Sequence, residues 1–299
     1  MSLSPSSGSV WVRVMPLVFV LIWSTGFIVA RYGMPHAPPM TFLSLRFVGS
    51  LLCFLGWIAV ARPAWPVNGG QWLHLGVTGV LMHAGYLGGV WVAVKAGMGS
   101  GVSALVVGLQ PVLTAMWLAT TGGQVTRRQW TGLGLGLAGL VLVVARKFNV
   151  QAPGDSVTWF NLCSAVVALC SITAGTLYQK RFVQACDVRT AGTVQLLAAL
   201  LVALPLAALE SEPVVWHPEV VGALVWSVLG LTLGGSSLLY LLIQRAAAAS
   251  VSSLMYLVPP CTALIAWVLF GEPITRVTVL GMALTAVGVS LVVRPARVA

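Results

Sequence analysis

The sequence predicts an all-α integral membrane protein with ten transmembrane helices, arranged as two inverted five-helix repeats with both termini in the cytoplasm. Three observations predict it: an apolar composition, ten long apolar segments and an internal repeat. Of the 299 residues, 58% are hydrophobic and only 7% are charged, and the mean hydropathy is +0.96. A soluble protein carries about a quarter charged residues. Most of this surface must therefore face lipid.

Ten apolar segments are long enough to cross a membrane, because a helix needs about 20 apolar residues to span a ~30 Å hydrocarbon core. They are 13–33, 40–61, 71–94, 99–121, 129–147, 157–181, 190–209, 219–243, 250–270 and 275–294. Barrel strands would alternate apolar and polar residues, which these segments do not do. The first segment has no convincing cleavage site after it, so it is expected to be a retained helix and not a signal peptide.

The expected organisation follows these segments. It comprises a cytoplasmic tail (1–12), a first repeat (13–148), a linker (149–156), a second repeat (157–294) and a second cytoplasmic tail (295–299).

Positive charge sets the expected orientation. Ten of the sixteen Lys and Arg residues fall on the side of the termini, five fall on the opposite side, and Arg46 lies within a span. The excess predicts cytoplasmic termini. A nucleic-acid partner is excluded, because no basic patch alternates with aromatic residues. The five cysteines form no C-x-x-C motif, so neither a disulfide framework nor a metal site is indicated.

An internal repeat relates the two halves. Segment 101–144 aligns with 250–293 at a constant offset of 149, without a gap. The matched pairs include Pro111 with Pro260, Gly132 with Gly281, and Gly139 with Gly288. Each half holds five spans, an odd number, so the halves must lie in opposite orientations. Inverted repeats are typical of secondary transporters, whose substrate site lies near the midplane where the halves meet.

The same residues resemble a known family. Pro259–Pro260, Gly271–Glu272–Pro273, Gly281 and Gly288 look like the end of an EamA-type half, from the ten-helix branch of the drug/metabolite transporter superfamily. The opening Trp23–Ser24–Thr25–Gly26–Phe27 is similar to the start of that family's first helix.

Arg46 also sits where the family tends to place an arginine. The first half departs from the pattern, because it reads Gly122–Gly123–Gln124 where an acidic residue is expected.

The resemblance implies a multi-pass protein of a bacterial inner membrane that transports small metabolites, often as efflux. The family includes exporters of amino acids, among them the YddG-like aromatic amino acid exporters, and the resemblance points to that subgroup. The implied partners are a small-molecule substrate, amino acids among the candidates, and the lipid bilayer. No cofactor is expected, and a monomer and a homodimer are both compatible with the sequence.

His83 and Tyr86 are the first candidates for a substrate-binding site. His83 is the only central group in the spans that titrates near neutral pH, and Tyr86 shares its helix face. Intramembrane ionisable residues are costly and tend to face cavities, so we favour a functional role. The alternative is a buried histidine bonded to a neighbouring helix.

Trp23 and Phe27 are the second candidates. Most tryptophans sit near span ends, where an aromatic belt explains them, but Trp23 is central, with Phe27 one turn on. An aromatic wall suits a flat or apolar substrate, and plain helix packing is an equally good reading.

Polar and aromatic residues at helical spacing complete the substrate-binding candidates. The alternative is that they pack helices together, and we favour that interpretation for the stripes of the fourth and sixth spans, which contain serine and threonine. They are Gln110, Ser171, Tyr178, Tyr240 and Tyr256.

Pro111, Pro259 and Pro260 are candidates for kinks or gates within helices, because proline removes a helical hydrogen bond. For Arg46, we favour snorkelling to the headgroups or pairing with the protein over attraction of a substrate carboxylate. Glu272, at a helix junction, is expected to hold the loop in place and not to move protons.

These features favour a secondary transporter that exports small amphipathic metabolites, such as aromatic or apolar amino acids, by alternating access. Transport of other metabolites or drugs is the main alternative. A facilitative channel is disfavoured because no repeated filter sequence or charge ring occurs. An intramembrane enzyme is disfavoured because no catalytic motif occurs and the four histidines are dispersed. Without a phosphate-binding G-x-x-x-x-G-K-[ST] motif, the energy would come from the substrate gradient, exchange or protons.

Overall fold

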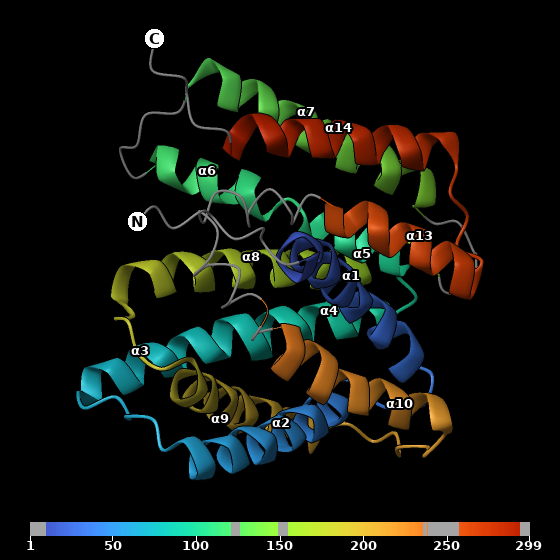
Figure 1. Ribbon diagram of the computed structural model, residues 1–299. Helices are drawn as coiled ribbons and strands as arrows, with labels where there is room; N and C mark the ends of the chain where they lie inside the picture. The colour runs from blue at the N-terminus through green and yellow to red at the C-terminus, as the bar shows by residue number, and fades with distance from the viewer. Residues whose placement is uncertain (1–9, 121–125, 149–154, 236–237, 239–256, 294–299) are drawn as a thin grey trace.

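The computed structural model describes residues 10–120, 126–148, 155–235, 238 and 257–293. Within these ranges the chain is helical, and the only β-type pairing is an isolated bridge between Phe148 and Val157. The elements of Figure 1 are α1 Val10–Gly33, α2 Pro39–Ala61, α3 Gly69–Gly79, η1 Val80–Gly85, α4 Tyr86–Lys95, α5 Ser100–Val107, α6 Gln110–Thr120, α7 Arg127–Lys147, α8 Trp159–Phe182, α9 Val188–Ala207, α10 Pro218–Trp226, η2 Ser227–Gly235, α13 Val258–Phe270 and α14 Arg276–Val293.

The predicted all-helical membrane architecture is confirmed in these ranges. Eight helical stretches are long and apolar enough to cross a membrane, and two shorter apolar helices, 258–270 and 276–292, stand where the last two spans are expected. Eight of the ten expected spans thus have full length in the described part of the chain.

Side chains that satisfy the first N–H groups define several helix starts. Thr126 and Thr158 cap α7 and α8, each with a reciprocal bond from the third helical residue, and Asp187 caps α9. His217 caps α10, whose first residue is Pro218. The boundaries of these spans are therefore set locally by sequence.

Three expected spans are interrupted in the described ranges. The third is α3, a π-helical turn η1 and α4, and the eighth is α10 followed by the π-helical η2. The fourth is α5 and α6, which are separated at residues 108–109. Pro111 is the second residue of α6 and has no N–H to bond the carbonyl of Val107, so the helix restarts there.

The expectation that prolines kink helices from within needs correction. Pro111 lies in the first turn of α6, and Pro259 and Pro260 lie in the first turn of α13. The N–H groups of the first turn have no carbonyl partner within the helix, so a proline, which lacks the N–H, is well tolerated there.

The packing of the helices follows the repeat. Helix α7 lies against α14, α2 against α9, and α5 against α13, and each of these pairs joins equivalent spans of the two halves. The contact of α4 with α8 has its counterpart in the contact of α1 with α10. The two halves are thus related by a pseudo-two-fold axis, as inverted repeats require.

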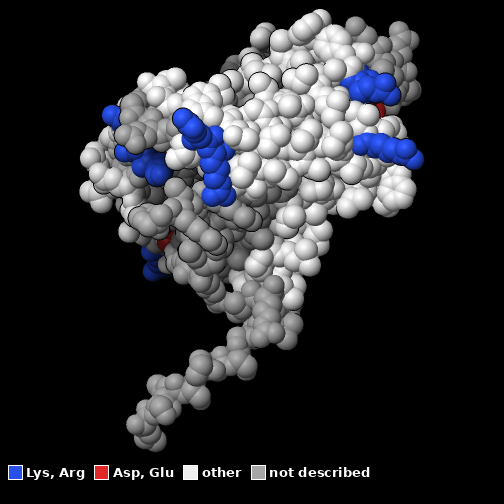
Figure 2. All heavy atoms as spheres, turned by 90° about the horizontal axis from the view of Figure 1, so that it is seen from above, with Lys and Arg blue, Asp and Glu red and all other residues white. Residues whose placement is uncertain are grey.

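The outer surface fits a lipid environment. Large apolar side chains are widely exposed on it, including Leu52, Val60, Leu201, Leu264 and Val268. Figure 2 shows Lys and Arg gathered toward two opposite ends of one face, with uncharged surface between them. We call the end that carries His36, Lys95, Asp155, Glu219 and Glu272 the outer end, after the side that the charge bias predicts.

Candidate functional site

Two π-helical segments interrupt equivalent spans of the two repeats. Segment η1 lies in the third span and holds His83, and η2 lies in the eighth span and holds Thr232. The Thr232 hydroxyl donates to the Ser227 carbonyl, five residues earlier, over 2.9 Å. Single π-turns are frequent at functional sites, because they displace side chains from the regular helix register.

Arg46, on α2, reaches the second of these segments. The residue is 7% exposed, and its Nη2 donates to the Thr232 hydroxyl over 3.3 Å. Its Cζ lies 5.6 Å from the ring centre of Trp91 on α4. The arginine points into the protein and does not snorkel to the surface, so that part of the expectation is wrong, whereas pairing with the protein is observed.

Two buried donors at this place have no hydrogen-bond partner within the described part of the chain. They are Nη1 of Arg46 and Nε1 of Trp91. Among the described residues, no carboxylate forms an ion pair with Arg46 either. Most buried polar groups in proteins are bonded, so the unpaired guanidinium nitrogen, with its Cζ over the ring of a tryptophan that has an unpaired indole nitrogen, marks a place for an acceptor.

His83 and Tyr86 face the same region. Both lie close enough to Arg46 for electrostatic interaction, and the Phe47 ring meets the His83 ring edge-on at 6.3 Å. On its other side the His83 ring lies beside the amide of Gln195 on α9. We call Arg46, His83, Tyr86, Trp91 and Thr232 the central cluster. It joins α2, η1 and α4 of the first half to η2 of the second half.

Trp23 and Phe27 lie next to this region on α1. The Trp23 ring contacts the Phe19 ring at 5.4 Å and approaches η2 at Gly235. Phe27 is buried, and its carbonyl accepts a hydrogen bond from the Ser100 hydroxyl over 3.2 Å. Trp23 is thus placed to form a wall beside η2, and Phe27 serves mainly in the core.

The other predicted residues are not gathered with the central cluster. Gln110 bonds Thr176 over 2.9 Å, and Tyr178 bonds His74 over 2.8 Å. Ser171 packs against η1, where a Cβ atom added to Gly85 would lie 2.7 Å from its Oγ. Tyr240 and Tyr256 lie outside the described residues.

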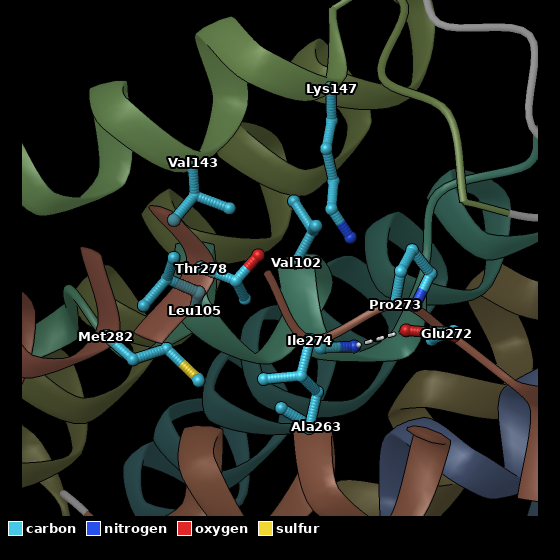
Figure 3. Close-up of a pocket in the computed structure, with 11 residues that line it drawn as sticks. Val102, Leu105, Val143, Lys147, Ala263, Glu272, Pro273, Ile274, Thr278 and Met282 are labelled. Atoms are coloured by element: carbon cyan, nitrogen blue, oxygen red, sulfur yellow. Dashed lines mark hydrogen bonds between the residues drawn. The ribbon is translucent and has the colours of Figure 1, made fainter. Parts of the chain in front are cut away.

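A separate pocket lies between α5, α7, α13 and α14 (Figure 3). Its walls are largely apolar, with Lys147 and Glu272 as the charged lining residues. Both charges already have partners: Lys147 bonds Asp155 at 2.6 Å, and Glu272 accepts from the backbone N–H of Ser100 at 2.9 Å and of Gly101 at 3.3 Å. This pocket therefore offers a ligand no free charged group among the described residues.

Glu272 caps a helix of the opposite repeat. Glu272 follows α13, and its carboxylate accepts hydrogen bonds from the first N–H groups of α5. Burial raises the pKa of its carboxyl, and the two N–H groups partly oppose that rise. Glu272 thus holds the junction of the two halves at the outer end.

Trp91 and Thr232 are the members of the central cluster that sequence reasoning missed. Trp91 stands near the end of its span, where a belt position is the ordinary reading. Thr232 is one of many small polar residues, and its meeting with Arg46 across the halves has no local sequence signal. The in-span charge of Arg46 is the signal from which the rest of the cluster can be found.

Comparison with known proteins shows a consistent relationship. The model of the EamA-like transporter family matches the chain twice, over residues 10–145 and 159–294. A "Probable amino-acid metabolite efflux pump" of Salmonella typhimurium is 27% identical over 57% of this chain and 54% of its own length. This chain therefore spans about half the length of that relative.

Other relatives match over nearly their whole length. An "Uncharacterized transporter" of Archaeoglobus fulgidus is 25% identical over 91% of this chain and 93% of its own length. The "Uncharacterized inner membrane transporter YedA" of Escherichia coli is 24% identical over 91% of this chain and 87% of its own. One crystal structure is similar with a TM-score of 0.58 at 19% identity, covering 93% of this chain and 94% of that one, and shows the same fold.

Proposed function

Because the chain belongs to the EamA-like transporter family, we propose that it exports small amphipathic metabolites that carry a carboxylate, in the first place aromatic or apolar amino acids, by alternating access. The protein is a multi-pass inner membrane transporter. The proposal concerns its substrate, its direction and its mechanism.

The observation that carries the substrate class is the unpaired Nη1 of buried Arg46, whose Cζ lies over the ring of Trp91, a residue with its own unpaired Nε1. A buried cation without a counter-ion is costly. A substrate carboxylate would supply the missing charge and accept from both donors, and hydrogen bonds of this charged kind are the stronger ones. The binding energy of the carboxylate would thus come from groups that have no partner among the described residues.

Aromatic rings around these donors favour a flat or apolar substrate side chain. Trp91 and Phe47 are fully buried in the interior, and Trp23 approaches from α1 beside η2. Ring faces of this kind contact aromatic groups in offset or edge-on arrangements. In this arrangement His83 and Tyr86 would bond the remaining polar groups of the substrate.

The central cluster joins the two inverted halves, which is the place where secondary transporters hold their substrates. The π-turns η1 and η2 occur in equivalent spans of the halves, and the fourth span restarts as α6 before Pro111. Such breaks are natural hinges, because each lacks part of the regular helical bonding. In our proposal, one half rocks against the other around the central cluster.

The direction of transport is supported by the name of the Salmonella relative, a probable efflux pump for amino-acid metabolites. Since that match covers about half of the relative, the direction for this chain rests on experiment.

Counterflow in proteoliposomes tests the proposal. Vesicles that contain the purified protein are preloaded with one unlabelled amino acid at a time and offered a trace of the labelled one. We expect saturable, trans-stimulated uptake of aromatic amino acids, weakened by Trp91→Phe, which keeps an aromatic ring, although a smaller one, and removes the unpaired N–H. Val60→Ala, on the exposed lipid-facing surface of α2, is the matched control. Absence of exchange in folded protein would reject amino acids as substrates, and a leak that does not saturate would indicate a channel.

A further inference from the structure

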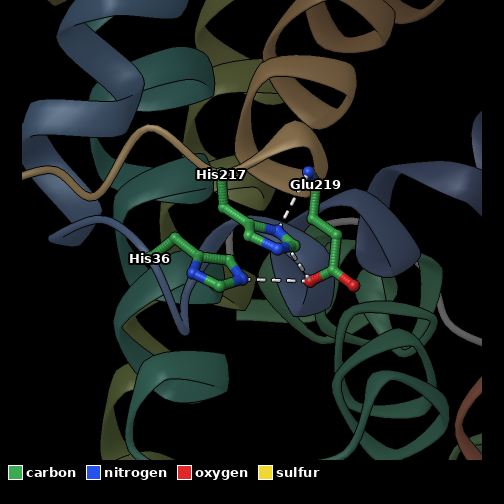
Figure 4. Close-up of side chains that lie close together, drawn as sticks. All are labelled: His36, His217 and Glu219. Atoms are coloured by element: carbon green, nitrogen blue, oxygen red, sulfur yellow. Dashed lines mark hydrogen bonds and ion pairs between the residues drawn. The ribbon is translucent and has the colours of Figure 1, made fainter.

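His36, His217 and Glu219 lie together at the outer end, although positions 36 and 217 belong to different repeats. His36 follows α1 in the connection to α2, and His217 and Glu219 begin α10. The two imidazole rings stack at 4.6 Å with 15° between their planes (Figure 4). The expectation from the sequence that the histidines are dispersed is thus wrong for this pair.

Nitrogen atoms of both rings face one carboxylate oxygen. Nε2 of His36 lies 3.0 Å from Oε2 of Glu219, and Nδ1 of His217 lies 3.9 Å from the same atom. One ligand atom from each residue can be chosen so that all three lie within 4.8 Å of one another. Three donor atoms from two parts of the chain therefore converge on one point (Figure 4).

The bonding of His217 indicates that this point suits a cation. Its Nδ1 accepts the backbone N–H of Glu219 at 3.4 Å, which is the cap of α10. A neutral imidazole has one donor and one acceptor nitrogen, so this Nδ1 carries a lone pair and no proton. The same Nδ1 lies 3.9 Å from Oε2 of Glu219. To bind an ion there, this lone pair would exchange the backbone N–H of Glu219 for the metal.

We propose that His36, His217 and Glu219 bind a divalent transition-metal ion, Zn²⁺ in the first place. Two imidazoles and one carboxylate are a preferred ligand set for zinc, and a three-ligand site leaves a fourth position for water. Calcium and magnesium prefer sites made wholly of oxygen ligands. Ligand atoms of a tetrahedral zinc ion lie about 3.3 Å apart, so the side chains close by roughly 1–1.5 Å. Their exposure, 21% for His36, 49% for His217 and 46% for Glu219, leaves room for that closure and access from solution.

Coordination by Nε2 of His36 uses the tautomer of that ring with its proton on Nδ1. The bound ion replaces the hydrogen bond between His36 and Glu219, and also the cap hydrogen bond from the Glu219 N–H to Nδ1 of His217.

The place of the site in the fold gives the ion a second effect. His36 belongs to the first repeat, and His217 and Glu219 belong to the second, so the ion fastens the two halves together at the outer end. The backbone N–H of Val215 already donates to the His36 carbonyl over 2.8 Å, and Lys95 pairs with Glu212 over 2.6 Å. A metal bridge added to these contacts would resist opening of the outer end. Bound zinc should therefore slow a transporter that must open there.

Calorimetric titration of ZnCl₂ into the purified protein, prepared without a polyhistidine tag, tests the site. We expect one zinc ion per chain, with at least about tenfold weaker binding in His36→Ala, His217→Ala and Glu219→Gln. His74→Ala removes a histidine that pairs with Tyr178 elsewhere and should keep the affinity of the wild type. Equal affinity in wild type and the three variants, or no binding to wild type, would overturn the proposal.

Counterflow with and without zinc tests the bridge between the halves. Zinc should slow exchange by wild-type protein and leave exchange by His217→Ala unchanged. Equal inhibition of both would overturn the bridge. Because calorimetry needs no transport, the metal site can be tested even if the proposed substrate is wrong.

Discussion

The Thr285 hydroxyl on α14 donates a hydrogen bond to the Gly136 carbonyl on α7 over 3.4 Å, and these two residues are 149 positions apart. That separation equals the offset of the internal repeat, so Gly136 and Thr285 are equivalent residues of the two halves. A residue meets its own equivalent only near the axis that relates them. The pseudo-two-fold axis therefore passes between α7 and α14, and the repeat seen in the sequence is also a packing rule.

Glycines on both sides of this axis allow the two helices to touch. A Cβ atom added to Gly132 would lie 2.5 Å from the Gly288 carbonyl oxygen, and Gly139 and Gly281 form the equivalent contact. We expect Gly132→Ala to lower the free energy of unfolding by about 1–3 kcal/mol, because the backbones must separate. Thermal unfolding in detergent measures it. Gly134→Ala, on the same helix with nothing within 4 Å of the added atom, is the control. An equal loss in both variants would show that close packing is not the cause.

Arg46 should discriminate substrates by their carboxylate. In Arg46→Gln, we expect affinity for an aromatic amino acid to fall about tenfold or more, since a hydrogen bond to a charged group contributes about 1.5–3 kcal/mol. Affinity for the corresponding amine without a carboxylate should change little. The two affinities can be measured from the ligand-induced rise in unfolding temperature. Equal weakening of both ligands would assign Arg46 to structure alone.

The sequence predicted the helical architecture and the relation of the halves because both leave a signal in the chain. Apolar length identifies a span, and Pro111 with Pro260, or Gly132 with Gly281, keep the register of the repeat. The central cluster was only half predicted. His83 and Tyr86 were found because polar groups within apolar spans stand out.

What the sequence could not supply is the partner of each side chain. For Arg46 the sequence left snorkelling and pairing with the protein open, because a long stem two turns into a helix allows both, and only the packing of η2 brings Thr232 within reach. For Gln110 and Tyr178 helix packing was favoured over a place along a pathway, and the particular partners, Thr176 and His74, appear only in the structure. The meeting of His36 with His217 depends on two connections of different repeats and has no local signal at all.

Glu272 should make the stability of the protein depend on pH at values above the ordinary pKa of a glutamate carboxyl. Burial raises the pKa of this carboxyl from its reference value of 4.5. Because the pKa is raised in the folded state, the contribution of this carboxyl to stability is full below pH 4.5. It is lost as the pH rises through the pKa of the folded state. As the pH rises above 4.5, the unfolding temperature of wild type should therefore fall relative to Glu272→Gln, which cannot ionise. The lowered pKa of Asp187, beside Arg189, acts in another window, because its contribution is lost only as the pH falls below 3.8. Parallel curves for wild type and Glu272→Gln would contradict this assignment.

One substitution in η1 should disturb its contact with α8, and a second substitution in α8 should restore that contact. A Cβ atom added to Gly85 would lie 2.7 Å from Oγ and 3.0 Å from Cβ of Ser171, so Gly85→Ala should push α8 away from the π-turn that carries His83. We expect this variant to lose counterflow activity, because His83 shifts relative to Arg46. Ser171→Gly removes both contacting atoms, and in the double variant activity should return toward that of Ser171→Gly alone. Such a return is a coupling between neighbours, which independent sites do not show. If the double variant were as inactive as Gly85→Ala, the loss would come from the altered conformational freedom of η1 and not from its packing against α8.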